Sequence, residues 1–123
     1  MALTATIYTF DIDLADHDRG VYEALALRVA RHPSESEEFL VTRVLAYALE
    51  FVDGIGFSKG LSDPDESAIA VRDLTGKVRS WIEVGTPDSD RLHRASKAAA
   101  RVAVYIHKDP AQFMSRLARF TAR

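Results

Sequence analysis

Cysteine is absent from the 123 residues of this chain, so disulfide bonds and thiolate metal sites are excluded. No apolar run approaches the ~20 residues that a membrane-spanning helix needs, and the first residues lack a basic region followed by a hydrophobic one. We therefore expect a cytoplasmic protein. Histidine is sparse and lacks the spacing of a zinc site; the four positions are His17, His32, His93 and His107.

Several motifs that mark enzyme classes are also missing. The sequence has no phosphate-binding P-loop, no dinucleotide-binding glycine pattern, no GxSxG nucleophile elbow and no HExxH zinc motif. Nucleotide binding, acyl hydrolysis and zinc-protease chemistry therefore have no support in the sequence. The length suits one hydrophobic core, and we expect a single domain over residues 1–123.

The hydrophobic patterns predict an α/β domain with a mixed sheet, in the order β-β-α-β-β-β-α-β-α. Residues 8–14 alternate apolar and polar side chains, as a half-buried strand does. Residues 21–31 fit two structures, because their alanines favour a helix while their apolar spacing also fits one face of a strand. The tight turn before them favours the strand, and hence an N-terminal β-hairpin. The other predicted elements are a helix from the N-cap Ser34 to about Phe51, a strand over 55–61, a hairpin over 68–84, a helix that begins at Thr86 and Pro87, a strand over 103–107 and a helix from Asp109 to about Phe120.

The hairpin over residues 68–84 sets the positions of most candidate functional residues. Two short β-type runs flank a turn that contains Thr75 and Gly76. If these two residues form the loop, the numbers of each facing pair add up to 151. Glu83 then lies opposite Ala68.

Acidic residues converge at one end of this hairpin. Asp65 and Glu66 lie within a few residues of Glu83, whereas Asp73 lies ~15 Å away at the other end. Two neighbouring carboxylates repel each other unless a cation or a proton compensates, and a hard divalent ion bound through oxygen atoms is the usual solution. The alternative is that the turn acids are simply solvated. Glu38 lies one turn into the predicted helix, where its charge complements the helix dipole.

Two sets of motifs resemble known families. Pro64-Asp65 followed by Glu83-Val84-Gly85 resembles the PD-(D/E)xK nuclease signature, with Gly85 in place of the lysine. A wider set, spread over nearly the whole chain, resembles the YaeQ family of bacterial proteins. The motifs that carry this resemblance are His32-Pro33-Ser34-Glu35, Lys59-Gly60-Leu61 with Asp65-Glu66, and Trp81-Ile82-Glu83-Val84-Gly85-x-Pro87-Asp88 with Arg91.

The resemblance to the YaeQ family implies a fold related to the PD-(D/E)xK nuclease core, α-β-β-β-α-β, in a bacterial cytoplasmic protein. It also implies that this chain is a fragment or a short member, because members are typically longer at the C-terminus. The implied activity is that of a metal-dependent nuclease or phosphodiesterase with Mg²⁺ or Mn²⁺, and the missing lysine leaves an inactive relic of that fold as the alternative. The candidate catalytic residues are Asp65, Glu83, Lys59 and Arg91, and the candidate metal ligands are Asp65, Glu83 and Glu38.

Charge is distributed unevenly along the chain. Residues 1–90 contain 8 Lys/Arg and 17 Asp/Glu, a balance of −9, and residues 91–123 contain 8 and 1, a balance of +7, which together give −2. A basic C-terminal third is what a phosphate-binding surface needs. The alternative function is therefore a non-catalytic module that binds nucleic acid or an acidic protein, and exposed sheet edges would also allow homo-oligomers. The predicted binding face consists of Arg91, Arg94, Lys97 and Arg101.

Overall fold

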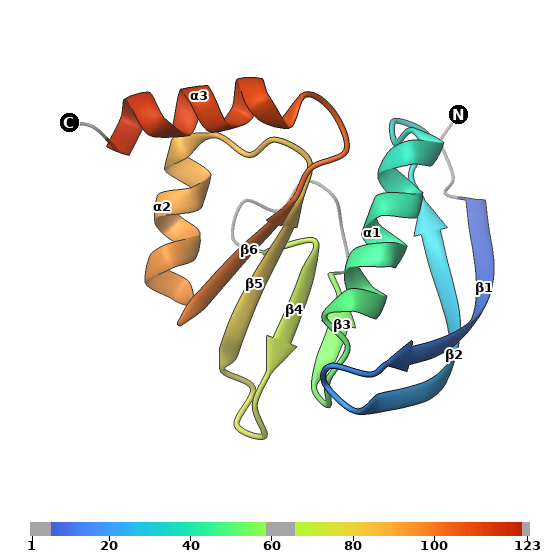
Figure 1. Cartoon of the computed structure of the whole chain (residues 1–123). Coiled ribbons are helices and arrows are strands. Elements are labelled where there is room, and N and C mark those ends of the chain that lie inside the picture. The colour runs from blue at the N-terminus through green and yellow to red at the C-terminus, as the bar shows by residue number, and fades with distance from the viewer. Residues whose placement is uncertain (1–5, 59–65, 122–123) are drawn as a thin grey trace, which may run out of the picture. The chain divides into compact units, whose positions relative to one another are not determined.

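The structure, a computed structural model, describes residues 6–58 and 66–121 of the chain. The chain divides into two compact units, Met1–Ser36 (unit 1) and Glu37–Arg123 (unit 2). Figure 1 shows the elements of both units, and each unit is described by itself. The single domain expected from the sequence stays a prediction.

Unit 1 is an antiparallel β-hairpin. Strand β1 (Thr6–Asp16) pairs with β2 (Val21–Arg31) over their whole length, from Thr6 opposite Arg31 to Asp16 opposite Val21. The hairpin prediction is thereby confirmed, and the ambiguous segment 21–31 is a strand. In the turn, Arg19 donates from its Nε to the Asp16 carboxylate at 2.6 Å, and this hydrogen bond lowers the pKa of Asp16.

The chain between β2 and the first helix forms a turn and not the predicted start of the helix. The backbone N–H of Glu35 donates to the carbonyl of His32 at 2.8 Å, and the Glu35 carboxylate accepts from the backbone N–H of His32 at 2.9 Å. The hydroxyl of Ser34 lies 2.7 Å from Nδ1 of His32. The prediction that Ser34 caps the helix is wrong, because its side chain is engaged by His32.

Unit 2 contains a four-stranded sheet in the order β3-β4-β5-β6, with three helices. The first three strands are antiparallel neighbours, and β6 runs parallel to β5. The mixed sheet and the parallel crossover after the predicted hairpin are therefore confirmed. The elements are α1 (Glu37–Leu49), β3 (Ile55–Phe57), β4 (Ile69–Arg72), β5 (Val78–Val84), α2 (Ser89–Ala98), β6 (Arg101–Tyr105) and α3 (Pro110–Thr121).

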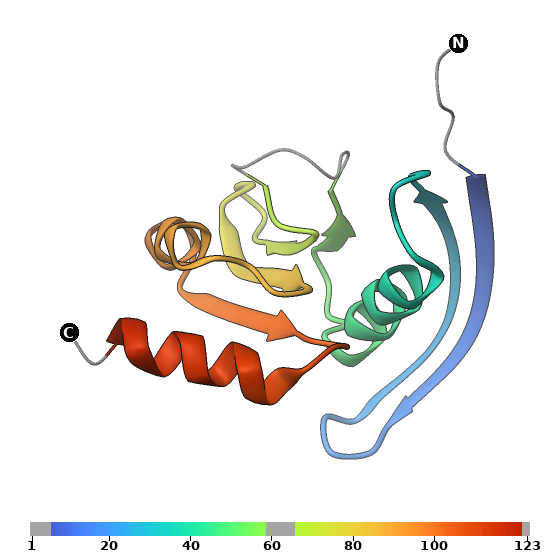
Figure 2. The ribbon, with the colours of Figure 1, turned by 90° about the horizontal axis from the view of Figure 1, so that it is seen from above.

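The two faces of this sheet are covered by different helices. Ile82 and Val84 of β5 pack with Ala46 of α1, whereas Trp81 packs with Ala95 of α2. Figure 2, seen from above, shows α1 and α2 on opposite sides of the sheet. Because side chains alternate along a strand, the side chain of β5 residue 83 belongs to the face that α2 covers.

Away from its turn, the hairpin β4–β5 has the predicted register. The turn itself differs from the prediction. Facing pairs such as Ile69 and Ile82 add up to 151 as expected. Nearer the turn the sum is 150, because Asp73 faces Lys77 and donates its backbone N–H to the carbonyl of Lys77 at 2.9 Å. The loop therefore has three residues, and a β-bulge restores the register beyond it. The two-residue loop of the sequence prediction is wrong.

Candidate functional site

Glu83 is a buried acid near the end of the central strand β5. The residue is only 5% exposed, although a carboxylate is rarely buried without a partner. Its Oε1 accepts a hydrogen bond from Nε1 of Trp81 at 2.7 Å and forms an ion pair with Arg91 at 2.9 Å. The site is therefore built from one strand, β5, and from α2, which packs on the same face.

Arg91 is held in place by the start of α2. Asp88 is the N-cap of this helix, and its Oδ1 accepts from the backbone N–H of Arg91 at 2.8 Å. The prediction that Thr86 caps the helix, with Pro87 at its first position, is wrong. The cap at Asp88 places Arg91 in the first turn, where its side chain reaches back over the end of β5.

The guanidinium of Arg91 joins three parts of unit 2. Besides the ion pair with Glu83, it donates to the backbone carbonyl of Glu66 at 2.6 Å. It also lies 5.7 Å from the ring centroid of Trp81, within the range of a cation–π contact. Arg91 thus supplies the positive charge next to the carboxylate of Glu83. In an acidic site that binds a metal, the ion supplies this charge.

Gly85, which stands where the nuclease signature compared in the sequence analysis has its lysine, has a backbone conformation that favours glycine. Its φ is +100°, in the region that side chains disfavour. Its backbone N–H donates to the carbonyl of Tyr105 at 2.9 Å, which fixes this conformation against β6. A Cβ at this position would lie 3.4 Å from the ring of Phe39. The local backbone therefore disfavours a lysine at residue 85.

The structure brings together only some of the predicted site residues. Glu83 and Arg91 are in contact, whereas Lys59 and Asp65 lie outside the described residues. Glu38 belongs to α1, which covers the opposite face of the sheet; its side chain is 71% exposed, and its Oε2 lies 4.0 Å from Nζ of Lys108. Within residues 6–58 and 66–121, no three His, Asp or Glu residues form a group that could hold a metal. The metal site stays a prediction.

The predicted basic face is divided between two elements. Helix α2 ends at Ala98, so Arg101 belongs to β6 and not to the helix. Arg101 forms an ion pair with Glu50, and its second guanidinium nitrogen donates to that carboxylate at 3.2 Å. Among the Lys and Arg residues of α2, Arg94 and Lys97 are exposed, whereas Arg91 is half-buried. The helix predicted from Thr86 ends at Ala98, and the strand predicted to begin at residue 103 begins at Arg101, because residues 101–105 pair with β5.

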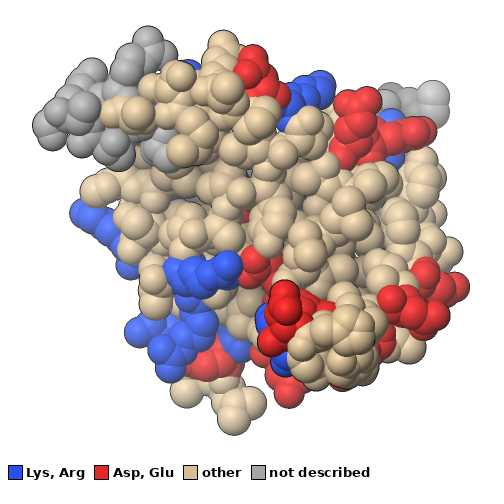
Figure 3. Space-filling model, viewed as in Figure 1, with Lys and Arg blue, Asp and Glu red and all other residues tan. Residues whose placement is uncertain are grey.

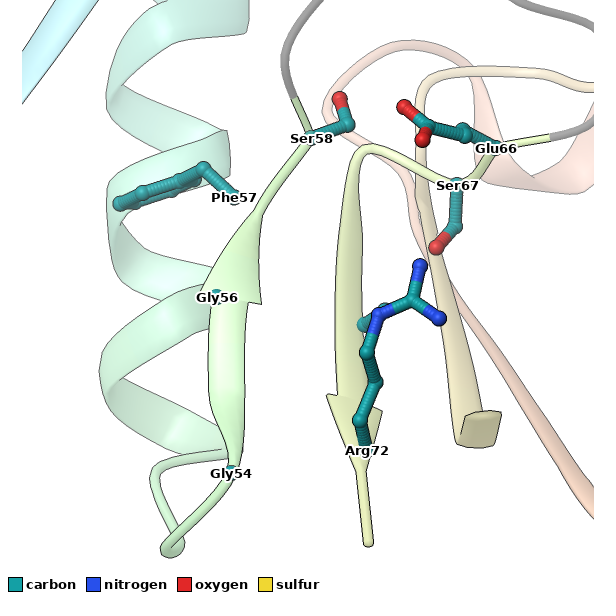
Figure 4. Close-up of a pocket in the computed structure, with 8 residues that line it drawn as sticks. Gly54, Gly56, Phe57, Ser58, Glu66, Ser67 and Arg72 are labelled. Carbon is teal, nitrogen blue, oxygen red and sulfur yellow. The ribbon is translucent and has the colours of Figure 1, made fainter. Parts of the chain in front are cut away.

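The sequence analysis missed a shallow pocket of about 180 Å³ on the sheet between β3 and β4. Figure 4 shows Glu66 and Ser58 near one end and the guanidinium of Arg72 along β4, while the ring of Phe57 points away. Gly54, just before β3, and Gly56 of β3 line the pocket, and no pattern in the sequence indicated it. The lining residues are Gly54, Gly56, Phe57, Ser58, Glu66, Ser67, Ala70 and Arg72.

Comparisons with known proteins identify the family. The model of the family "YaeQ protein" matches residues 1–121. The chain belongs to the YaeQ family. Uncharacterized protein YaeQ of Salmonella typhi is 36% identical over 126 residues, which cover 98% of this chain and 70% of that protein. Uncharacterized protein YaeQ of Escherichia coli (strain K12) is 37% identical over 111 residues, which cover 90% and 61%.

Crystal structures of two YaeQ proteins have the same fold. The protein from Pseudomonas syringae gives a TM-score of 0.86 at 41% identity, covering 91% of this chain and 63% of that chain. The protein from Xanthomonas axonopodis pv. citri also gives 0.86, at 35% identity, covering 98% and 69%. This chain thus spans 61–70% of the length of these YaeQ relatives. None of the helices described here is long and apolar enough to cross a membrane.

Proposed function

We propose that this member of the YaeQ family binds nucleic acid without a metal ion. In this proposal its acidic site is of the nuclease type, but the side chain of Arg91 occupies the place of the ion beside Glu83. The ion pair of 2.9 Å between Arg91 and the buried Glu83 carries the proposal. A divalent ion bound to Oε1 of Glu83 would lie beside the guanidinium of Arg91, because this oxygen is the one that pairs with the arginine. Since like charges repel strongly where water is excluded, the arginine and a metal compete for this site. The bacterial cytoplasm stays the predicted compartment.

The proposed binding surface lies at the other end of the sheet. Arg101 of β6 lies beside Ser80 of β5, and Val78 of β5 packs against the cluster that contains Ala99, the C-cap of α2. The β4–β5 hairpin, β6 and the C-terminal end of α2 therefore bring their basic residues to the same end of the sheet. Figure 3 shows Lys and Arg gathered over it, at the lower left of the view. We call this set the basic end; its exposed residues are Arg72, Lys77, Arg79, Lys97 and Arg101. Cations spaced over one surface favour contact with a phosphate backbone.

A binding experiment tests this proposal against a metal-dependent reaction. We expect the chain to bind a labelled DNA duplex with an affinity that falls steeply with salt, both with and without EDTA. Glu83→Gln should bind equally well once circular dichroism shows that it is folded. A Lys77→Ser, Lys97→Ser double variant should bind more weakly and with a smaller salt dependence. Salt-independent binding, or no binding by the wild-type chain, would contradict the proposal.

A second candidate function is a metal-dependent nuclease or phosphodiesterase. It is favoured by the bond from Arg91 to the carbonyl of Glu66, because Asp65 directly precedes Glu66 in the chain. In this reading Asp65 and Glu83 would hold Mg²⁺ or Mn²⁺, and Lys59 or Arg91 would replace the lysine. Glu38, the third predicted ligand, lies on α1 over the opposite face of the sheet and would have to reach the ion from there. The ion would supply polarisation of a phosphate oxygen and a lower pKa for a bound water.

Calorimetry with Mn²⁺ decides between the two candidates. We expect no heat of binding at millimolar Mn²⁺ for the wild-type chain. Binding that disappears in Glu83→Ala would establish the metal site and overturn the arginine-occupied one. Mn²⁺ binding by Glu38→Ala then shows whether this third predicted acid is a ligand. Cleavage of a phosphodiester substrate by the wild type and not by Glu83→Ala would establish the reaction.

We also propose that copies of the chain pair through a sheet edge. Strands β3 and β6 are the edges of the sheet that the structure describes in unit 2, and an unpaired edge can pair with another chain. Light scattering over a range of concentrations tests this, and a mass that stays at the monomer value would overturn it.

A further inference from the structure

The turn between β4 and β5 presents one apolar side chain at its tip. Leu74 is fully exposed, with a relative exposure of 107%. Isolated apolar residues are common on protein surfaces, so exposure alone is no evidence for a function. This leucine, however, is held by a well-organised turn and lies among cations.

Asp73 organises this turn around Leu74. One carboxylate oxygen of Asp73 accepts hydrogen bonds from the backbone N–H of Thr75 at 2.9 Å, from the Thr75 hydroxyl at 2.5 Å and from the backbone N–H of Lys77 at 3.1 Å. Gly76, with a φ of +89°, donates its backbone N–H to the carbonyl of Asp73 at 3.0 Å. The turn is thereby fixed by its own residues, and Leu74 projects from it.

Basic residues flank the same turn. Arg72 donates from its guanidinium to the carbonyl of Gly76 at 3.1 Å, so its charge lies beside the loop. Lys77 is exposed directly after the loop. The extra residue of the β-bulge is Arg79, whose Nε lies 3.2 Å from the Asp73 carboxylate and whose side chain is 61% exposed. The tip therefore combines one apolar side chain with three cations, of which Arg79 is paired with the Asp73 carboxylate.

We infer that the tip of the β4–β5 hairpin is a wedge for duplex DNA, in which Leu74 enters the minor groove between base pairs while Arg72 and Lys77 contact the phosphates. Apolar side chains of this kind unstack base steps and bend the duplex in minor-groove binding proteins. The inference rests on the proposed nucleic-acid binding and assigns the residue that meets the bases.

Two features of unit 2 favour a duplex over other anionic partners. Proteins that bind single strands stack bases on exposed aromatic rings, and no aromatic side chain of unit 2 is exposed among those the structure describes. An anionic membrane requires more apolar area than one leucine offers, since even a whole myristoyl chain binds only marginally. One leucine suffices as a wedge when cations already hold the duplex.

The test compares Leu74→Ser with Leu45→Ser, a matched change at another exposed leucine, which is on α1. Fluorescence anisotropy measures binding to an A·T-rich duplex of two helical turns and to one of its strands. Energy transfer between dyes at the duplex ends measures bending. We expect Leu74→Ser to weaken duplex binding about tenfold, to abolish bending and to keep the wild-type salt dependence. Leu45→Ser should match the wild type, and Lys77→Ser should reduce the salt slope by about one.

The outcomes separate the wedge from the binding function. If wild type and Leu74→Ser bind the duplex equally while Lys77→Ser binds more weakly, the wedge is overturned and the nucleic-acid surface stands. Tighter binding to the single strand than to the duplex also overturns the wedge. If the wild type binds neither, the proposed function itself fails. Vesicles of equal parts phosphatidylcholine and phosphatidylglycerol complete the test, because binding to them that needs Leu74, without duplex binding, would assign the tip to membranes.

Discussion

Glu83 of β5 and Arg91 of α2 form a buried ion pair of 2.9 Å at the end of the sheet. The two residues are close in sequence, and the turn at Gly85 leads from the strand to the helix that carries the arginine. Trp81 donates a hydrogen bond to the same carboxylate oxygen. A buried ion pair adds little net stability compared with apolar side chains, but losing one partner leaves the other charge buried and unpaired.

Arg91→Ala should therefore destabilise unit 2 strongly. The side chains of Arg91 and Glu83 are 22% and 7% exposed, so the remaining carboxylate has little access to water. We expect a loss of about 3 kcal/mol in the free energy of unfolding, at the lower end of the range for a broken buried pair. Urea unfolding followed by circular dichroism measures it.

Two further variants test whether the cause is the unpaired charge. Arg91→Ala in a Glu83→Gln background should cost clearly less, because no buried charge is left behind. Arg94→Ala, an exposed arginine on the same helix, should change stability by no more than ~0.5 kcal/mol. Equal losses for Arg91→Ala in both backgrounds would show that the arginine acts only by packing and by its bond to Glu66.

Restoring a lysine at residue 85 should cost stability through the backbone. Gly85 has a φ of +100°, and a side chain in this region costs about 1–2 kcal/mol. Gly85→Lys and Gly85→Ala should therefore lose similar amounts in thermal or urea unfolding, and neither should gain phosphodiesterase activity. Gly56→Ala is the control, because its φ is not positive and a Cβ there would meet nothing within 4 Å. Activity gained by Gly85→Lys alone would contradict our view of this site.

Asp73 should make the β4–β5 turn sensitive to acid. The hydrogen bond from the Thr75 hydroxyl, those from the backbone of Lys77 and Thr75, and the Arg79 charge hold the pKa of Asp73 below its ordinary value. Because the folded-state pKa is the lower one, the stabilisation is complete above ~3.9 and disappears as the pH falls through the folded value. Amide exchange at Lys77 should be faster in Asp73→Asn than in wild type at neutral pH. The two should converge in strong acid; a difference that persists there would contradict this account.

The sequence predicted the parts of the fold that depend on local periodicity. The two short β-type runs and the turn glycine between them indicated the hairpin and its register from Ile69 to Val71. The loop itself was wrong by one residue, because the side chain of Asp73 closes a three-residue turn and Arg79 bulges out to compensate. Such side-chain to backbone bonds leave no periodic signal. The predicted proximity of Asp65 and Glu83 is untested, since Asp65 lies outside the described residues.

The sequence identified Arg91 as a candidate functional residue, but it did not predict that Arg91 pairs with Glu83. Arg91 was named as a candidate catalytic residue and as part of the basic face. Its pairing with Glu83 depends on the cap at Asp88, which fixes the rotation of α2. The pair between Glu50 and Arg101 joins residues 51 apart, and no local pattern indicates such a contact.

Glu50 links the end of α1 to β6 through two hydrogen-bonding partners, and this gives a fourth prediction. Its carboxylate accepts from the hydroxyl of Tyr105 and from the guanidinium of Arg101, whose pKa is raised by this bond. Arg101 is 55% exposed, whereas the Glu50 side chain is 12% exposed and Tyr105 is half-buried. Because water screens an exposed ion pair, the bond to Tyr105 should contribute more. We expect Glu50→Ala to cost about 2 kcal/mol and Arg101→Ala less than ~1 kcal/mol in urea unfolding.

A double-mutant cycle between Glu50→Ala and Tyr105→Phe isolates the hydroxyl bond. The coupling free energy should be about 1 kcal/mol, since removing both partners leaves no unsatisfied buried group behind. The cycle with Arg101→Ala should give a smaller value that declines further at high salt, because that pair is largely open to solvent. If the Arg101 cycle gives the larger coupling, then the ion pair and not the tyrosine holds α1 to β6.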